Sequence, residues 1–337
     1  MTQPTIPLES LSIHGAGLHR PECVVVHDSG CIVVPDWTDE GGVAVVEIAS
    51  GRVGHVLARR AGAGLKPNGI MLEAGGSVLL THLGAEDGGV YRLFPDGRDE
   101  PVLTAADGAP LPPTNFVAKD PQGRLYVTVS TRHVPRHRAA HAGVRDGFIV
   151  LCPVDGEPRI VADGLGYTNE CVFDAAGRHL YVNETFSRET SRFAVAPDGS
   201  LGPREVVARY GDGIYPDGLA FDVEGGLWVT SIVSNTVLRV LPDGSRTLMV
   251  QDRDDDYVAV MERAYGAGSL TRELLDAHHA GRLKNISNLA FGGEGHRTIF
   301  LGCLAGEAIV SLPAPVAGLP LPQQSVDIAP LVAAAFA

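Results

Sequence analysis

Short stretches of alternating apolar and polar residues run along most of the chain, and they fall into one longer repeated phrase. The phrase reads NFVAKDPQGRLYVTVS at 115–130, NECVFDAAGRHLYVN at 169–183 and DGLAFDVEGGLWVTS at 217–231. Each copy starts with Asn or Asp, alternates as a strand, turns at D-x-x-G and ends in a second apolar strand. A further strand and a P-D-G turn follow, as in VLRVLPDGS at 237–245, so each copy predicts a multi-stranded antiparallel unit.

Three fainter copies extend the repeat towards both ends of the chain. They read ECVVVHDSGCIVVPD at 22–36, NGIMLEAGGSVLLT at 68–81 and NLAFGGEGHRTIFLG at 288–302. The six copies therefore start near 22, 68, 115, 169, 217 and 288. A four-stranded blade of a β-propeller takes roughly 40 to 50 residues. The repeat predicts an all-β fold, a six-bladed β-propeller that forms a single domain over residues 1–337.

Two intervals between copies are longer than a blade requires. Residues 131–147, TRHVPRHRAAHAGVRDG, are polar and rich in His and Arg, and they predict a lid or rim loop. In the insertion at 253–283, Tyr257, Met261 and Ala264 recur at helical spacing, which predicts one or two short helices packed on the propeller. Residues 8–18 are expected to supply the outer strand of the last blade and so close the ring.

The first residue of each repeat occupies an equivalent place in a propeller. The innermost strand of every blade lines the central channel, so these first residues meet at one end of it. They are Glu22, Asn68, Asn115, Asn169, Asp217 and Asn288, and all six carry a side-chain oxygen. Asn and Asp also start many turns, and for one repeat that explanation would suffice. Six such residues in phase favour a binding site.

Side-chain oxygens of this kind are typical ligands of a hard divalent cation. Two carboxylates with two or more amides suit Ca²⁺ best, and Mg²⁺, Mn²⁺ or Zn²⁺ would also be accepted. The second strand of each blade returns to the same rim, so the ends of these strands together are expected to surround the cation. These ends include His82, Arg132 with His133, and Glu184, which we expect to line a substrate pocket. Their side chains could hold a carboxylate or hydroxyls of the substrate.

The phrases YTNECVFDAAGRHLYVNET and YPDGLAFDVEGGLWVTS resemble those of the family of senescence marker protein, gluconolactonase and luciferin-regenerating enzyme. The P-D-G phrase before a G-x-L-W strand is the most specific part of a resemblance that covers most of the chain. Members of that family are six-bladed propeller hydrolases that bind one divalent cation. The resemblance implies Glu22, Asn115, Asn169 and Asp217 as the metal ligands, and all four belong to the ring of six.

The resemblance also implies hydrolysis of a sugar-derived or other small lactone. On this interpretation the enzyme is metal-dependent and gluconolactonase-like, and Asp217 both binds the metal and activates water. Asn68 and Asn288 would then be hydrogen-bonding groups of the pocket. Cys23 and Glu170 stand where the family has Gly, so the pocket wall need not resemble that of a sugar lactonase.

Two other functions stay open on the sequence alone. One is a different metal-dependent hydrolase on the same scaffold, such as a phosphotriesterase. The other is a non-enzymatic propeller that binds a ligand or a partner protein, because propellers host many functions. The sequence contains no G-x-S-x-G, H-E-x-x-H or P-loop phrase that would indicate another kind of catalytic site.

Composition limits the kinds of partner and the cellular compartment that we expect for this protein. The chain carries a net charge of −13 and no basic stripe, which argues against nucleic acid as a partner. Its five cysteines form no C-x-x-C pair and are typical of buried thiols in a reducing compartment. The start of the chain, MTQPTIPLES, has no signal-peptide pattern, and no apolar run is long enough for a membrane helix. We therefore expect a cytoplasmic monomer or homodimer that acts on a small molecule.

Overall fold

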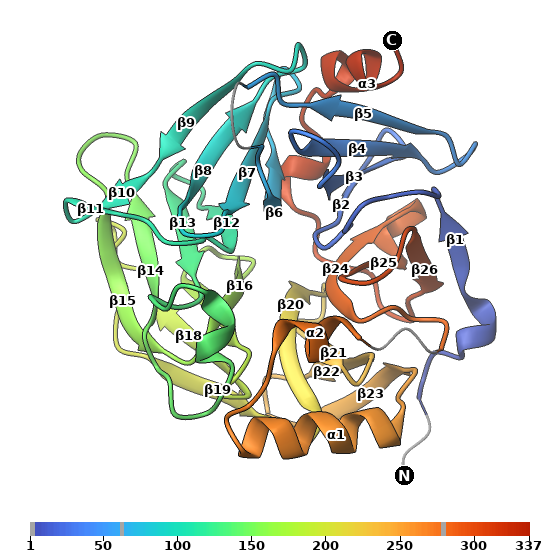
Figure 1. Ribbon diagram of the computed structural model, residues 1–337. Coiled ribbons are helices and arrows are strands. Elements are labelled where there is room, and N and C mark those ends of the chain that lie inside the picture. Colours follow the sequence, from blue (N-terminus) through green and yellow to red (C-terminus); the bar gives the residue numbers. More distant parts are fainter. Residues whose placement is uncertain (1–3, 61–63, 278–280) are drawn as a thin grey trace.

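Six four-stranded antiparallel sheets surround a central axis as the blades of a propeller (Figure 1). The computed structural model describes residues 4–60, 64–277 and 281–337. In these ranges the α-helices are α1 (Asp255–Gly266), α2 (Arg272–Asp276) and α3 (Ala329–Ala335), and none is long and apolar enough to cross a membrane. The predicted all-β, six-bladed propeller with a helical insertion is confirmed.

The first three blades follow one another along the chain, each with its strands in sequence order. The first blade consists of β2 (Val25–His27), β3 (Cys31–Asp36), β4 (Gly42–Glu47) and β5 (Val53–Leu57). The second consists of β6 (Pro67–Leu72), β7 (Val78–Leu83), β8 (Gly88–Leu93) and β9 (Asp99–Leu103). A small hairpin of β10 (Ala105–Ala106) and β11 (Ala109–Pro110) leads to the third, with β12 (Phe116–Lys119), β13 (Leu125–Val129), β14 (Gly147–Cys152) and β15 (Arg159–Leu165).

The last three blades complete the ring, and the N-terminal strand closes it. The fourth blade contains β16 (Thr168–Phe173), β17 (His179–Glu184), β18 (Glu189–Ala194) and β19 (Glu205–Arg209). The fifth contains β20 (Ile214–Phe221), β21 (Leu227–Val233), β22 (Thr236–Val240) and β23 (Arg246–Gln251). The sixth combines β24 (Ile286–Gly292), β25 (Thr298–Cys303) and β26 (Ile309–Pro313) with β1 (Ser12–His14), which pairs antiparallel with β26. The expected closure of the ring by residues 8–18 is confirmed.

The D-x-x-G phrase forms the tight turn between the first two strands of a blade. In the fifth blade, Asp222 Oδ1 accepts hydrogen bonds from the backbone N–H groups of Glu224 and Gly226, at 2.9 and 2.8 Å. Gly225 takes a φ of 81°, which is the left-handed region that favours glycine. The other oxygen of Asp222 accepts from Trp228 Nε1 at 2.8 Å, so the turn also fixes the largest buried side chain of the core.

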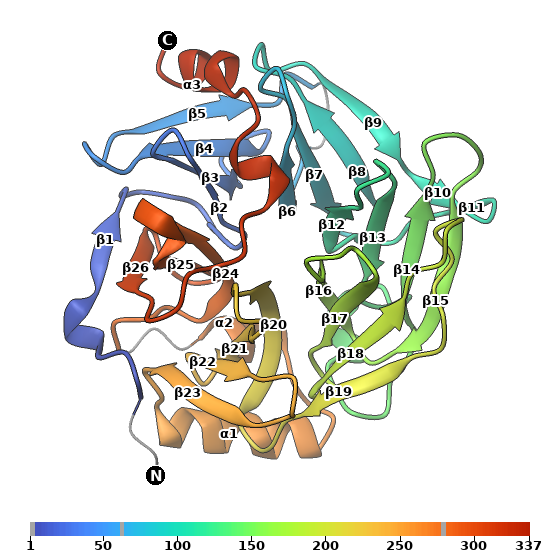
Figure 2. The ribbon, with the colours of Figure 1, turned by 180° about the vertical axis from the view of Figure 1, so that it is seen from behind.

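The C-terminal segment crosses the far end of the channel on its way to α3 (Figure 2). Gln324 is buried there, and its Nε2 donates to the carbonyls of Val26 and Phe291, at 2.9 and 2.7 Å. Gln323 Oε1 accepts from the N–H of Leu72 at 3.0 Å. These contacts join the innermost strands of the first, second and sixth blades, so the segment braces the end of the channel opposite the ring of predicted ligands.

The two insertions differ in secondary structure. Residues 253–283 contain α1 and α2, as predicted, although 278–280 lie outside the described residues. Val258 and Met261 of α1 are buried against the fifth blade, and the Asp254 side chain caps the helix by accepting from the N–H of Tyr257. Residues 131–147 form a loop, as predicted, with one short 3₁₀ turn at Arg136–Ala139. The helix α3 had no counterpart in the predicted elements, and it packs on β5.

Candidate functional site

Four of the six innermost strands carry a β-bulge at the residue predicted to face the channel. The register shifts fall between Pro67 and Ile70 in β6, Thr168 and Cys171 in β16, Pro216 and Leu219 in β20, and Ile286 and Leu289 in β24. A bulge places two residues of one strand opposite one residue of its partner and redirects their side chains. The bulges therefore break the regular alternation of each strand at the positions of Asn68, Asn169, Asp217 and Asn288.

Two buried threonines satisfy the backbone groups that the bulges release. Thr81 Oγ1 accepts from the N–H of Gly69 at 2.9 Å and donates to the carbonyl of Asn115 at 2.7 Å. Thr230 Oγ1 likewise accepts from the N–H of Gly218 at 2.8 Å and donates to the carbonyl of Ser287 at 2.6 Å. Each hydroxyl thus ties a bulge to the innermost strand of the next blade and fixes the backbone beside a predicted ligand.

The amide residues of the ring present oxygens that have no hydrogen-bond partner among the described residues. Asn115 Nδ2 donates to Ser130 Oγ at 3.2 Å, and Asn169 Nδ2 donates to Thr185 Oγ1 at 2.9 Å. The Oδ1 atoms of Asn68, Asn115 and Asn169 are buried and unpartnered. Because buried polar atoms are nearly always paired, three orphaned oxygens in one ring indicate a place for a bound group.

The two acids of the predicted ligand set are buried in the same place. Glu22 is 7% exposed and lies 2.8 Å from the guanidinium of Arg20, and Asp217 is 3% exposed. Burial raises the pKa of Asp217 well above its ordinary value, and the charges of Glu22 and Glu170 raise it further. Arg136 and Arg20 act in the opposite direction on this pKa. A cation that neutralised these carboxylates would relieve their mutual repulsion.

Glu170 is a third buried acid in the channel, and the sequence pattern did not assign it to the site. Asn288 Nδ2 donates to both of its carboxylate oxygens, at 2.9 and 2.8 Å, and Asn288 Oδ1 accepts from the N–H of Val24 at 2.8 Å. Burial raises the pKa of Glu170 to about 8, with a further contribution from the charge of Glu22. The amide of Asn288 therefore hydrogen-bonds to Glu170 and to the backbone just before β2 of the first blade.

These residues fit a hard divalent cation. Glu22, Asn115, Asn169 and Asp217 supply two carboxylates and two amide oxygens that lack partners, and such oxygens suit Ca²⁺ or Mg²⁺. Across the described part of the chain, no group of three or more His, Cys, Asp or Glu side chains is placed to hold a metal. The amides would therefore have to provide half of the ligands, which favours Ca²⁺ over Zn²⁺.

The remaining predicted pocket residues lie at varying distances from this ring. Asn68 belongs to it, and its Nδ2 donates to the carbonyl of Asn115 at 3.0 Å. His82 is buried at the end of β7, where its Nδ1 accepts from the N–H of Lys66 at 3.0 Å. Glu184 is buried within its own blade and accepts from Ser191 Oγ and Arg204 Nε. The side chain of Glu184 is thus engaged in a structural network of the fourth blade.

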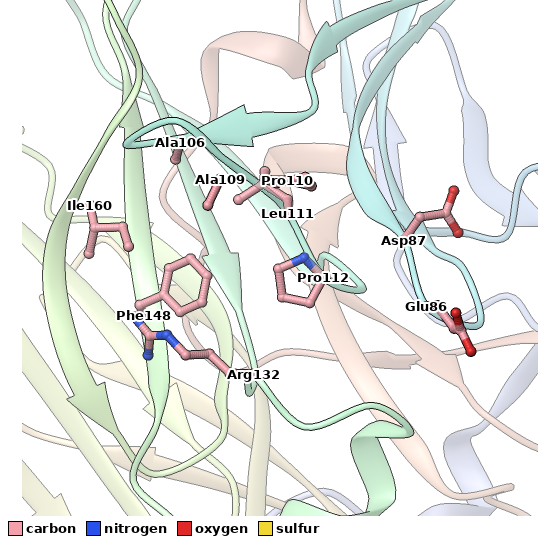
Figure 3. A pocket seen from close by; sticks show the side chains of 10 residues that line it. All are labelled: Glu86, Asp87, Ala106, Ala109, Pro110, Leu111, Pro112, Arg132, Phe148 and Ile160. Atoms are coloured by element: carbon pink, nitrogen blue, oxygen red, sulfur yellow. The ribbon is translucent and has the colours of Figure 1, made fainter.

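Arg132 and His133 lie outside the channel ring. Arg132 pairs with Asp163 through two hydrogen bonds of 2.8 and 2.9 Å, and His133 Nδ1 lies 2.9 Å from Asp146 Oδ2. Arg132 also lines a separate cavity of about 370 Å³ between the second and third blades, with Phe148 beside it and Glu86 across it (Figure 3). The structure does not bring these two residues together with the predicted ligands.

A six-bladed propeller with a buried, oxygen-rich ring at one end of its channel defines the class of this protein. The chain matches the model of the SMP-30/Gluconolactonase/LRE-like region over residues 21–252. It belongs to that family, as the sequence phrases predicted.

Solved structures share the fold at low sequence identity. A gluconolactonase from Xanthomonas campestris is 20% identical, with 94% of this chain and 96% of that chain covered and a TM-score of 0.66. A luciferin-regenerating enzyme is 12% identical, with 94% and 99% covered and a TM-score of 0.67. Regucalcin, a calcium-binding protein from Agrobacterium tumefaciens, is 16% identical, with 92% and 95% covered and a TM-score of 0.64. At these identities the likeness establishes the fold.

Proposed function

We propose that this protein is a metal-dependent hydrolase that opens a sugar-derived or other small lactone. The observation that carries the proposal is the ring of buried oxygens without partners, beside two buried carboxylates. Glu22, Asn115, Asn169 and Asp217 would hold one divalent cation, with Ca²⁺ as the best fit. Such a cation supplies polarisation of the substrate carbonyl and a lower pKa for a coordinated water.

Asp217 is the proposed general base. Of the two buried carboxylates in the proposed ligand set, Glu22 is ion-paired with Arg20, whereas Asp217 forms no ion pair among the described residues, so Asp217 is the better placed to accept a proton. The carboxylate of Asp217 takes a proton from water, and the water oxygen bonds to the lactone carbonyl carbon. The ring C–O bond then breaks, and the ring oxygen receives the proton, so the product is an open-chain hydroxy acid.

The surrounding residues hold this arrangement in place. Asn183 Nδ2 donates to the carbonyl of Asp217 at 2.9 Å, and Thr185 Oγ1 bridges Asn169 and the carbonyl of Pro216. The backbone on both sides of the base is therefore hydrogen-bonded to the fourth blade. This support limits movement of Asp217 relative to Asn169, which a shared ligand set requires.

The test is hydrolysis of aldonolactones, aromatic lactones and organophosphates by the purified protein, before and after chelation, with the metal content measured. We expect lactone turnover that a chelator removes and Ca²⁺ restores. Turnover of organophosphates alone would favour a phosphotriesterase on this scaffold. Tight binding of a ligand or a partner protein that persists unchanged after chelation, without any turnover, would favour a non-enzymatic propeller.

A further inference from the structure

A cavity of about 400 Å³ lies beside residues that contact the ring of predicted ligands. The described residues that line it are Arg20, Trp37, Leu83, Gly84, Ala85, Pro113, Pro135, Arg136, His137 and Arg272. Two of them connect it directly to the ring. Arg20 is ion-paired to Glu22, and Arg136 Nη2 donates at 2.8 Å to Ser130 Oγ, the same atom that holds the amide of Asn115. The volume is that of a small-molecule pocket.

The wall of this cavity is cationic. Three arginines and His137 line it, and none of its described lining residues is acidic. Lys66 adds a further positive charge nearby, with its Nζ 5.3 Å from the centre of the Trp37 ring. The separate cavity beside Arg132 differs in this respect, because Glu86 and Asp87 line it along with the arginine. The positive wall is therefore a local property of this cavity, in a chain whose net charge is −13.

The acidic ring alone does not account for this positive charge. Arg20 compensates Glu22 directly, and a divalent cation would compensate two further carboxylates in the channel. Arg136 donates to a neutral hydroxyl and forms no ion pair with a carboxylate in the described ranges of the chain. Its Nε is buried without a hydrogen-bond partner. An anion in the cavity would give this guanidinium the charged partner that it lacks among the described residues.

Both insertions of the propeller contribute to the wall. Arg136 and His137 lie in the 3₁₀ turn of the 131–147 loop, and Arg272 begins α2 of the second insertion. Among the lining residues from the blades and their connections, Arg20 is the one cationic residue, and the centre of the Trp37 ring lies 4.6 Å from its guanidinium. The segments that interrupt the repeat therefore bring cationic side chains to the mouth of the channel.

We infer that the substrate of this protein is an anion, namely a lactone that carries a carboxylate or phosphate group, with Arg136 as its anchor; the inference rests on the proposed lactone hydrolysis. The planar guanidinium can bind an oxyanion through two parallel hydrogen bonds, which a lysine cannot do. With its charged end at Arg136, such a substrate would extend towards the ring of predicted ligands, because Arg136 and the Asn115 amide share Ser130 Oγ.

The test compares three matched lactones with the Ca²⁺-loaded protein. They are a neutral hexonolactone, the same lactone with a carboxylate at C6, and the same lactone phosphorylated at C6. We expect kcat/KM to be at least about tenfold higher for a charged lactone than for the neutral one, and this ratio to shrink as salt is raised. The two charged compounds distinguish a carboxylate from a phosphate as the recognised group.

Variants of Arg136 separate recognition from folding. Arg136→Gln is expected to abolish the preference for the charged lactone, mainly through KM, and Arg136→Lys to keep part of it. Arg98→Gln removes the same charge from an exposed site in the second blade, where Arg98 lies near Glu100, and should keep the full preference. Equal kcat/KM for all three lactones, or a preference that Arg136→Gln leaves intact, would overturn the inference while leaving lactone hydrolysis standing.

Loss of the proposed function is a distinct outcome. If none of the three lactones is hydrolysed, calorimetric titration of each into the Ca²⁺-loaded protein tests the cavity directly. Tighter binding of a charged lactone that Arg136→Gln weakens would support the anion site without lactonase activity. Equal binding of all three, or no binding, would overturn the inference.

Discussion

Asn288 Nδ2 donates to both carboxylate oxygens of Glu170, at 2.9 and 2.8 Å, although the two residues belong to the sixth and the fourth blade. These blades are not neighbours, so the contact crosses the channel. It places a third carboxylate beside Glu22 and Asp217, and the charge of Glu22 raises the pKa of both Glu170 and Asp217. Glu170 therefore brings a third acid to the predicted cation site, and a bound cation would favour its charged form.

Removal of the Glu170 charge should weaken the affinity for a divalent cation. Glu170→Gln keeps the size of the side chain and deletes the charge, and we expect Ca²⁺ to bind about 10- to 100-fold more weakly. Isothermal titration calorimetry measures the change. Glu205→Gln is the control, because it removes an exposed acid of the same blade that pairs with Arg192. Equal Ca²⁺ affinity in wild type and Glu170→Gln would contradict a contribution of Glu170 to the site.

Asp217→Asn should abolish turnover while the fold persists. The amide keeps the shape of the carboxylate but accepts no proton from water, and we expect kcat to fall about 10²- to 10⁴-fold. Saturating Ca²⁺ should restore activity to Glu22→Gln, whose defect is ligation, and should leave Asp217→Asn inactive. Recovery of Asp217→Asn at high Ca²⁺ would show that its role is ligation alone. Circular dichroism checks that both variants are folded.

The stability of the protein should fall as the pH decreases below about 6.5, in part because of His82. Burial lowers the pKa of His82 from its ordinary value of 6.5, and Asp87 opposes this effect while Arg60 and Lys66 add to it. Below pH 6.5 the unfolded chain then binds more protons at this site than the folded chain, so the free energy of unfolding decreases. The decrease ends below the pKa of His82 in the folded protein.

Urea unfolding of the wild type and His82→Asn at pH 7.5 and 5.5 measures the contribution of His82. Asn offers an oxygen that can accept from the N–H of Lys66 but does not become charged. We expect a smaller loss of stability on acidification in the variant. An identical loss in both proteins would refute the assignment to His82.

The helix α1 should be held on the fifth blade by Glu262. Its carboxylate accepts from Arg188 Nη2 at 2.6 Å, Tyr215 Oη at 2.8 Å and the N–H of Gly213 at 2.8 Å. We expect Glu262→Gln to destabilise the protein by about 1–3 kcal/mol and to speed amide hydrogen exchange in residues 255–266. Asp256→Asn, on the exposed side of α1, is the control. Exchange in Glu262→Gln no faster than in the control would contradict this anchoring.

The sequence predicted the fold because the repeat reports it directly. Each D-x-x-G turn forms one local unit with its flanking strands. Six such units at blade spacing predict a closed ring of six blades. The closing strand β1 was predicted from the need to close the ring, and the helices α1 and α2 from helical spacing within the insertion. The C-terminal segment with Gln324 and α3 was missed, because it lies outside the repeat and its contacts join residues about 300 positions apart.

Part of the candidate site could also be predicted from the repeat. Repeat phase placed Glu22, Asn115, Asn169 and Asp217 at one end of the channel, and all four are buried in the structure. Glu170 was not assigned, because regular alternation puts it on the face opposite Asn169, and a β-bulge between Thr168 and Cys171 breaks that alternation. The signal available in the sequence was an acid directly after Asn169, where the resemblance implies Gly.

The cationic wall of the cavity could not be predicted from the repeat. Arg136 lies in an insertion that has no equivalent in the other blades, and its approach to the ring depends on how that loop folds back. The sequence singled out Arg132 and His133 in the same loop because they follow the end of β13. The structure pairs these two with Asp163 and Asp146 instead.

The occupancy of the ring can be measured in crystals grown with Mn²⁺, whose anomalous scattering locates the ion. Mn²⁺ shares the oxygen preference of Ca²⁺ and serves as its probe. The account predicts one anomalous peak per chain, bound by oxygens of Glu22, Asn115, Asn169 and Asp217, which Ca²⁺ in excess displaces. A peak held by other residues, or no peak at saturating Mn²⁺, would contradict the account.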